Sequence, residues 1–314
     1  MRIFLLPIST RRTLIYCERI QESLQKPGQK QPVSERILNR VSTTWAGWEK
    51  AEKGWQKKTT VYANYLFSRI PYEEWGLKSF PPATKKKLEE VDAGKHEVEC
   101  LYPGAFVKSG RVSELLQKLA TERQAFHRRA FWTNVALMPI SAPFTLVPII
   151  PNLPFFWLCF RAYSHYRALY GGKFLEHVLQ KNLVKTTDSR LMDELYATGL
   201  QHPTREASRE ATKPSAEEIE VVVKDVETKA GSEGSEGKEI MLLQRWNGKL
   251  IAEDFKLAEM EIEIERAVEQ VEKVLYGEKK KLDEGRIEEK TKYDIVSEET
   301  KPSTTESEIR RAKR

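Results

Sequence analysis

Three polar side chains follow the longest apolar stretch of this sequence at a spacing that could support chemistry. Arg161 and His165 are four residues apart and Ser164 adjoins His165, so a helix would place all three on one face. Arginine keeps its charge, whereas histidine is the side chain whose ordinary pKa lies nearest neutrality. Together with Arg167, these residues predict either contacts with lipid headgroups or the lining of a path for protons or cations.

The rest of the sequence offers no pattern typical of an enzyme. It contains no glycine-rich nucleotide-binding motif, no HExxH and no GxSxG. The histidines do not combine with carboxylates at metal-ligand spacing; they are His96, His127, His165, His177 and His202. Three widely spaced cysteines, Cys17, Cys100 and Cys159, argue against a disulfide framework or structural zinc and favour a reducing compartment. We therefore expect no enzymatic activity, no cofactor and no metal.

An uncharged run of 31 residues, from Ala130 to Phe160, stands out in a chain whose mean hydropathy is -0.56. A helix that crosses a bilayer needs about 20 apolar residues. Basic residues adjoin both ends of the run, with Arg128 and Arg129 before it and Arg161 directly after it. Because positive flanks prefer one side of a membrane, the run is expected to enter and leave the membrane on the same side.

Closely spaced prolines divide this apolar run. Pro148, Pro151 and Pro154 are three residues apart, and an α-helix does not easily continue through that spacing. Asn152 is a suitable N-cap for a new helix, in which Pro154 falls in the first turn, where its missing N–H costs little. The sequence therefore predicts a membrane-embedded helical hairpin, with helices over about 112–147 and about 153–180 and a turn at Pro148, Pro151, Asn152 and Pro154.

The N-terminal stretch MRIFLLPISTRRTLIYC contains two short apolar runs around a polar turn, which predicts a β-hairpin. Because the stretch is rich in arginine and nearly free of acids, a cleaved mitochondrial presequence is the alternative. The following helix, over about 34–69, carries an apolar stripe at helical spacing. Its tryptophans could pack against the rest of the domain or lie at a lipid interface; they are Trp45, Trp48 and Trp55.

The net charge of +6 is distributed unevenly. Residues 1–129 contain 24 Lys and Arg against 14 Asp and Glu, a net of +10, whereas residues 203–314 contain 22 against 28, a net of −6. A basic region beside an apolar segment predicts contact with anionic lipid. Nucleic acid, the other common partner of basic regions, is not expected here.

These patterns predict a mainly α membrane protein with long amphipathic helices, a short N-terminal β-hairpin, a proline-broken membrane helical hairpin, and a disordered linker and tail. Residues 1–129 are expected to form a basic, mainly helical domain that starts with the β-hairpin, followed by the membrane hairpin over 130–170 and a helical extension over 171–202. A disordered linker over 203–239, an amphipathic or coiled-coil helix over 240–276 and a charged, disordered tail over 277–314 complete the expected order.

The stretches MRIFLLPISTRRTLIYC and PNLPFFWLCFRAYSHYRALYGG, together with the tryptophan-rich helix, resemble the fungal mitochondrial K+/H+ exchange-related family. The resemblance covers roughly residues 1–200 and extends to the helix near 242–276. It implies a mitochondrial inner-membrane protein that acts with a larger partner of the LETM-domain type. It supplies no ion-coordinating residues that could be carried onto this sequence.

From the patterns and the resemblance we expect a mitochondrial inner-membrane protein that contributes to potassium–proton exchange and to matrix volume and cation homeostasis. An accessory or regulatory subunit is expected, with both termini in the matrix and a LETM-domain-type protein or other complex subunits as partners. Two alternatives stay open. One is a homo-oligomeric K+/H+ exchanger, because a single hairpin is small for an alternating-access transporter. The other is a membrane-tethered assembly factor that binds ribosomes or respiratory subunits through its basic surface.

Overall fold

The computed structural model describes residues 1–18, 40, 43, 47–48, 50, 53–143, 152–202, 204–231 and 238–299. It divides into two compact units, Met1–Gln270 and Val271–Arg314. The strands are β1 (Arg2–Pro7), β2 (Thr13–Cys17), β3 (Val98–Tyr102) and β4 (Val184–Asp188). The helices are α2 (Trp55–Ser68), α3 (Tyr72–Ser79), α4 (Lys85–Asp92), α5 (Ser109–Thr121), α6 (Gln124–Ser141), α7 (Leu153–Gln180), α8 (Arg190–Gln201), α9 (Arg205–Glu210), α10 (Ala216–Gly231), α11 (Arg245–Asp254) and α12 (Ala258–Glu299).

The strands form one mixed sheet in the order β2-β1-β3-β4. β1 and β2 pair antiparallel, with Phe4 opposite Tyr16, so the predicted N-terminal β-hairpin is confirmed. β1 also pairs in parallel with β3, where Ile3 lies opposite Cys100, and β3 pairs in parallel with β4. These parallel pairs join segments that are far apart in the chain, and local sequence patterns do not reveal such pairings.

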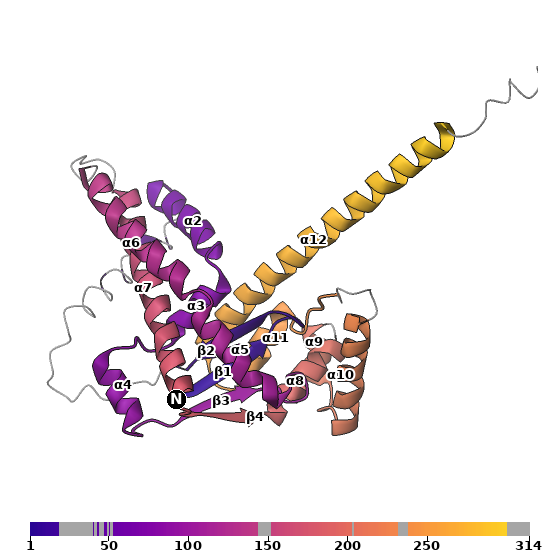
Figure 1. The fold of residues 1–314 in the computed structure, drawn as a ribbon, viewed down its shortest axis with the longest axis horizontal. Coiled ribbons are helices and arrows are strands. Elements are labelled where there is room, and N and C mark those ends of the chain that lie inside the picture. Colours follow the sequence, from indigo (N-terminus) through magenta and orange to yellow (C-terminus); the bar gives the residue numbers. More distant parts are fainter. Residues whose placement is uncertain are drawn as a thin grey trace, which may run out of the picture. The chain divides into compact units, whose positions relative to one another are not determined.

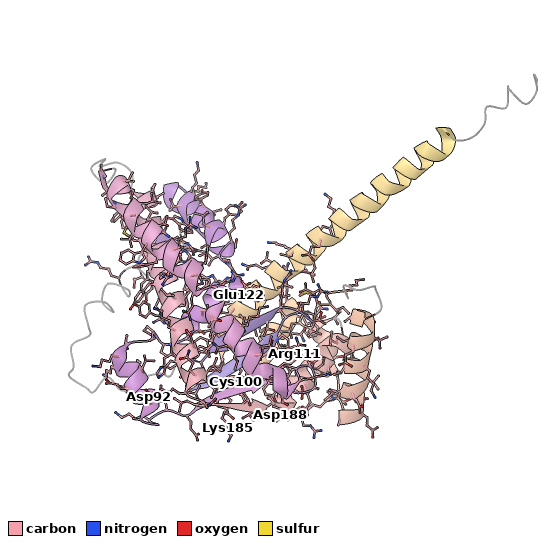
Figure 2. The ribbon with its side chains drawn as sticks, in the orientation of Figure 1. Asp92, Cys100, Arg111, Glu122, Lys185 and Asp188 are labelled. Carbon is pink, nitrogen blue, oxygen red and sulfur yellow. The ribbon has the colours of Figure 1, made fainter. Side chains whose placement is uncertain are left out.

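One face of the sheet is covered by α3, α5 and α7. Successive side chains of a strand point to opposite faces, and Cys100 of β3 points into this layer. It belongs to a buried core that includes Leu116 of α5 and Phe174 of α7. Figure 2 labels Cys100 in this core, and it labels Arg111 in the first turn of α5 and Glu122 directly after its last residue.

Segments beyond residue 190 complete the packing around β1. Phe4 points to the face opposite the α5 layer, and its ring meets that of Phe255 edge-on at a centroid distance of 5.1 Å. The hydroxyl of Tyr196 on α8 donates to the Pro7 carbonyl at 3.1 Å, and Tyr196 is fully buried. The backbone N–H of Leu242 donates to the carbonyl of Ile8 at 2.8 Å. The first unit is therefore built from both halves of the chain.

α6 and α7 form an antiparallel helical hairpin and lie side by side in Figure 1. The Asn152 side chain accepts from the backbone N–H of Phe155 at 3.0 Å and caps α7, and Pro154 lies in the first turn. The predicted helix over about 153–180 is therefore confirmed. The helix predicted over about 112–147 is instead divided into α5 and α6, with Pro139 inside α6.

The predicted fold class is wrong in its membrane component. The structure is mostly helical with a small mixed sheet, and none of the helices in the described residues is both long and apolar enough to cross a membrane. The physical reason is that the apolar run is shared between two helices that also hold charges. α6 includes Arg128 and Arg129, and α7 includes Arg161 and Arg167.

The range 203–239, predicted as a disordered linker, holds α9 and α10 among its described residues. α10 packs its apolar face against α8, where Ile219 and Val222 contact Ala197. The range 240–276, predicted as one amphipathic helix, contains α11 and the first part of α12. The predicted tail begins within α12, and residues 300–314 lie outside the described residues.

Candidate functional site

Glu74 on α3 is the centre of a buried cluster of charged and polar side chains between α3, α6 and α7. Its side chain is only 1% exposed, and an ionised carboxylate is costly in a protein interior unless it is paired. Arg161 of α7 makes a bidentate pair with it: Nη1 donates to Glu74 Oε1 at 2.8 Å and Nη2 donates to Oε2 at 3.1 Å. Ser164, on the same face of α7, donates its hydroxyl to the same carboxylate.

Two histidines extend this cluster from α7 to α6. His165 Nε2 lies 2.9 Å from Arg161 Nη2, and because arginine only donates, this nitrogen accepts. A neutral His165 therefore carries its proton on Nδ1, which lies 3.0 Å from Nδ1 of His127. That nitrogen of His127 accepts in turn, so the His127 proton resides on Nε2. This buried atom has no hydrogen-bond partner among the described residues.

Burial and ion pairing act in opposite directions on the Glu74 carboxyl. Burial would raise its pKa, but the hydrogen bonds from Arg161 and Ser164 outweigh burial and hold the pKa below its ordinary value. Burial lowers the pKa of His127 to about 4, and burial also lowers the pKa of His165. At neutral pH the cluster therefore holds one carboxylate, one guanidinium and two neutral imidazoles.

A second cation and a second arginine tie the end of α3 to α7. Lys78 Nζ lies 3.3 Å from the centroid of the Trp75 ring, also on α3, and 5.5 Å from the centroid of the Phe160 ring on α7. Burial lowers the pKa of Lys78 to about 8. Arg167 donates from Nη2 to the carbonyl oxygens of Lys78 and Phe80 at 3.0 and 3.2 Å. These carbonyls end α3 and have no partner within the helix, so the arginine satisfies them.

Glu74, His127 and His165 are also residue types that bind transition metals, and one ligand atom of each lies within 4.8 Å of the others. The charge arrangement fits a metal poorly. A metal on His165 Nδ1 would move the His165 proton to Nε2, toward which Arg161 already donates. It would also place a divalent cation beside a guanidinium that already neutralises Glu74. We therefore interpret the cluster as an ion-pair network in which Arg161 occupies the position of the cation.

Two consecutive glycines allow α7 to approach its neighbours closely enough to build this cluster. A Cβ on Gly171 would lie 2.0 Å from the carbonyl oxygen of Leu77 at the end of α3. A Cβ on Gly172 would lie 2.8 Å from the carbonyl oxygen of Ala120 on α5. Only glycine permits backbones to meet at such distances. Gly171 thus sets the separation of α7 from α3, and with it the reach from Arg161 to Glu74, whereas Gly172 sets the separation of α7 from α5.

The structure brings together part of the set of site residues predicted from the sequence. Arg161, Ser164 and His165 meet in the buried cluster. Arg167 lies apart from it, at the end of α3, and the flanking basic pair Arg128 and Arg129 is exposed on α6. The roles predicted for these residues, as headgroup contacts or as the lining of an ion path, stay predictions.

The predicted turn and tryptophan residues are placed only in part. Asn152 and Pro154 begin α7, whereas Pro148 and Pro151 lie outside the described residues. Trp45 also lies outside them, Trp48 is partly buried, and Trp55 is the first residue of α2. The packing and lipid-interface alternatives for these tryptophans are therefore still predictions.

Sequence reasoning misses two members of the cluster, Glu74 and His127. The sequence patterns described above predict no helix over the stretch IPYEEWGLKSFPP, yet residues Tyr72–Ser79 form α3 and bury Glu74. A signal was present in α7, because a buried face with Arg161 requires a carboxylate partner from elsewhere. The adjacent acids Glu73 and Glu74, set among apolar and aromatic residues, are candidates for that partner.

The fold and the site define a mostly helical protein with a small mixed sheet, in which three helices enclose a buried ion-pair network. Over residues 2–179, more than half of the chain, the sequence matches the family described as mitochondrial K+-H+ exchange-related. The chain belongs to this family, which confirms the family expected from the sequence. The family description relates the chain to potassium–proton exchange in mitochondria.

Two fungal relatives show how far the similarity extends. An uncharacterized protein of Schizosaccharomyces pombe is 28% identical over 194 residues, which cover 62% of this chain and 82% of the relative. An uncharacterized protein of Saccharomyces cerevisiae is 22% identical over 236 residues, which cover 67% of this chain and 73% of the relative. No solved structure matches the chain.

Proposed function

We propose that this chain is an accessory or regulatory subunit of potassium–proton exchange at the mitochondrial inner membrane, where it contributes to matrix volume and cation homeostasis. One observation carries the proposal: residues 2–179, which match the exchange-related family, contain the entire buried cluster from Glu74 to His165. Buried ionisable groups with displaced pKa values concentrate at functional sites. A proton-sensitive network inside this region suits a protein linked to proton exchange.

The cluster would respond to protons through the contact between His127 and His165. In the neutral state one Nδ1–H donates to the other Nδ1 across 3.0 Å. Protonation of His127 would place a proton on its accepting Nδ1 and set two N–H donors against each other, so the contact between α6 and α7 would have to open. Acidification toward the His127 pKa of about 4 would thereby be coupled to a change in the helical hairpin that a partner protein can sense.

The arrangement favours regulation over ion conduction by this chain. Arg161 already neutralises Glu74 and donates to His165, so the buried Glu74 carboxylate has a counter-ion and is not available to a potassium ion. We propose that the ions are carried by a larger partner, an inner-membrane protein of the LETM-domain type or another subunit of the complex. The role proposed for this chain is binding and regulation, without catalysis.

Swelling of isolated mitochondria in potassium acetate tests the proposal. Mitochondria that lack the chain are expected to lose most of the swelling, and the unaltered chain should restore it. The variant Glu74→Gln should restore it poorly, whereas Glu73→Gln, whose ion pair with Arg123 is partly exposed, should restore it fully. Normal swelling without the chain would refute the proposal.

A second measurement separates the accessory role from conduction. Purified chain in potassium-loaded liposomes is expected to show no potassium–proton flux above that of empty vesicles. Flux from the chain alone would instead identify it as the exchanger.

A further inference from the structure

Exposed apolar side chains are concentrated on one part of the first compact unit. Most of the large hydrophobic residues exposed in the described part of the chain lie on α2, α6 and residues 153–163 of α7. The most prominent are between 58% and 68% exposed: Val61, Tyr62, Trp132, Ile140 and Phe156. We call the exposed surface of these three segments the helical prong. Single exposed apolar residues are ordinary, but a concentration of them marks an interaction surface.

The three segments of the prong form one continuous body. α6 and α7 pack along each other, as Figure 1 shows. α2 joins them through Phe67, whose ring lies 6.1 Å from that of Trp157 and 4.9 Å from that of Phe160, centroid to centroid. The exposed residues of α2 therefore belong to the same surface as those of the hairpin.

The charges of the prong are all of one sign. Neither residues 53–72 nor residues 123–175 contain an aspartate or a glutamate. The exposed side chains of these segments include several cations: Lys57, Lys58, Arg69, Arg128 and Arg129. The surface thus combines exposed tryptophan and tyrosine with arginine and lysine. Such a surface is complementary to a binding partner that is negatively charged and partly apolar.

We propose that the helical prong docks onto an anionic lipid surface and lies in the interface without crossing it. Tryptophan, tyrosine and basic side chains are the groups that favour the headgroup region, and basic residues are attracted to anionic lipid. Along α6 the basic pair precedes the apolar end, so Arg129 can contact phosphates while Ile140, about 17 Å further along, reaches the acyl boundary. Protein interfaces, in contrast, are depleted in lysine, and the prong exposes Lys57 and Lys58.

This inference deepens the proposed function, because it names the surface by which the subunit would contact the inner membrane. The test is sedimentation of the full chain with phosphatidylcholine vesicles that contain or lack cardiolipin. The unaltered chain is expected to sediment with the cardiolipin vesicles and to remain in solution with phosphatidylcholine alone. The double variant Arg128→Glu/Arg129→Glu should lower the apparent affinity by at least about tenfold. The double variant Trp132→Ser/Ile140→Ser should also lower it.

A matched control changes the same net charge elsewhere. The variant Lys181→Glu/Lys185→Glu alters two exposed lysines outside the prong and is expected to bind as the unaltered chain does. All the altered side chains are exposed, so circular dichroism should show unchanged folding. Equal loss of binding in the control and the prong variants would refute the proposal. Absence of vesicle binding by the unaltered chain would refute it too, as would a prong that instead mediates dimers in light scattering.

The two proposals fail in distinguishable ways. If the chain does not bind cardiolipin vesicles but its deletion still abolishes swelling in potassium acetate, the proposed function stands and the lipid-docking surface is refuted. If the chain binds these vesicles through the prong but deletion leaves swelling normal, the docking surface stands and the proposed function is refuted.

Discussion

Glu74 shows how one buried carboxylate joins α3 to α7, whose His165 in turn contacts His127 of α6. Replacing Glu74 with glutamine keeps the shape but leaves the guanidinium of Arg161, which is 15% exposed, without its counter-ion. Breaking a buried pair by removing one partner typically costs about 3–5 kcal/mol. We expect Glu74→Gln to lower the free energy of unfolding by that amount, measured by urea denaturation.

The neighbouring residue provides the control for this substitution. Glu73 pairs with Arg123 at 2.8 Å, but the two side chains are 22% and 37% exposed. A solvent-accessible pair of this kind contributes up to about 1 kcal/mol, so Glu73→Gln should change stability little. Equal losses in the two variants would mean that the buried network contributes no more than a surface ion pair.

His127 should make the stability of the fold depend on pH. Its pKa falls from 6.5 in the unfolded chain to about 4 in the folded protein, so the unfolded state binds the proton more readily between these values. The stabilisation is complete above about pH 6.5 and is lost as the pH falls toward 4, a change of about 3 kcal/mol. Urea denaturation from pH 7 to pH 4 should show this loss. His127→Phe should reduce the slope, and an unchanged slope would contradict the assignment.

At the scale of elements, the close approach of α7 to α3 depends on the absence of a side chain at Gly171. A Cβ there would lie 2.0 Å from the Leu77 carbonyl oxygen, and this oxygen belongs to backbone that cannot rotate away. We expect Gly171→Ala to destabilise the protein by about 1–3 kcal/mol or more and to lower the thermal midpoint.

Gly110 in α5 is the matched control, because a Cβ there meets nothing within 4 Å. Gly110→Ala should stabilise the helix by up to about 1 kcal/mol, since alanine is the better helix former. If both substitutions stabilised the protein, α7 and α3 would not be in the close contact described.

Local sequence patterns predict some elements of this fold but do not predict the contacts between distant segments. The Asn152 cap and Pro154 define the start of α7 within the sequence itself, and the two apolar runs of residues 2–17 define the β-hairpin. The pairing of Ile3 with Cys100 and of Arg161 with Glu74 joins distant segments. The sequence around each of these residues does not specify its partner. The strand order of the sheet and the members of the cluster that lie outside α7 therefore could not be predicted from local patterns. The membrane prediction failed because hydropathy along the chain does not show how the apolar run is divided between α6 and α7, each of which also holds charged residues.

At the scale of the whole molecule, the helical hairpin of α6 and α7 has two surfaces with different roles. Its inner side holds His127 and His165, which pack against Glu74, and its outer side holds the exposed residues of the prong, such as Trp132. A change in the contact between the two histidines would therefore shift α6 relative to α7 and, because the helices are rigid, would also shift the exposed residues on their outer side. Proton binding and the proposed lipid docking are thus expected to influence each other.

The folded unit extends beyond the part of the chain that matches the family. β4 begins at Val184 and pairs with β3, and Tyr196 and Phe255 bury parts of β1. A chain ending at Asn182 would retain the complete cluster but would expose one edge of the sheet and the face of Phe4. We expect such a chain to aggregate or to lose its cooperative thermal transition, because exposed sheet edges and apolar faces promote association.

A chain of residues 1–270 is the corresponding positive control, because it contains the first compact unit as a whole. It should melt cooperatively and resist limited proteolysis, with a protected fragment longer than the family match. If the chain ending at Asn182 were equally stable and monomeric, the contacts of Tyr196 and Phe255 would add little to the fold, and the sheet would have to be stable with β3 as its edge. The comparison therefore tests whether the cluster depends only on its own three helices or on a core that later segments of the chain complete.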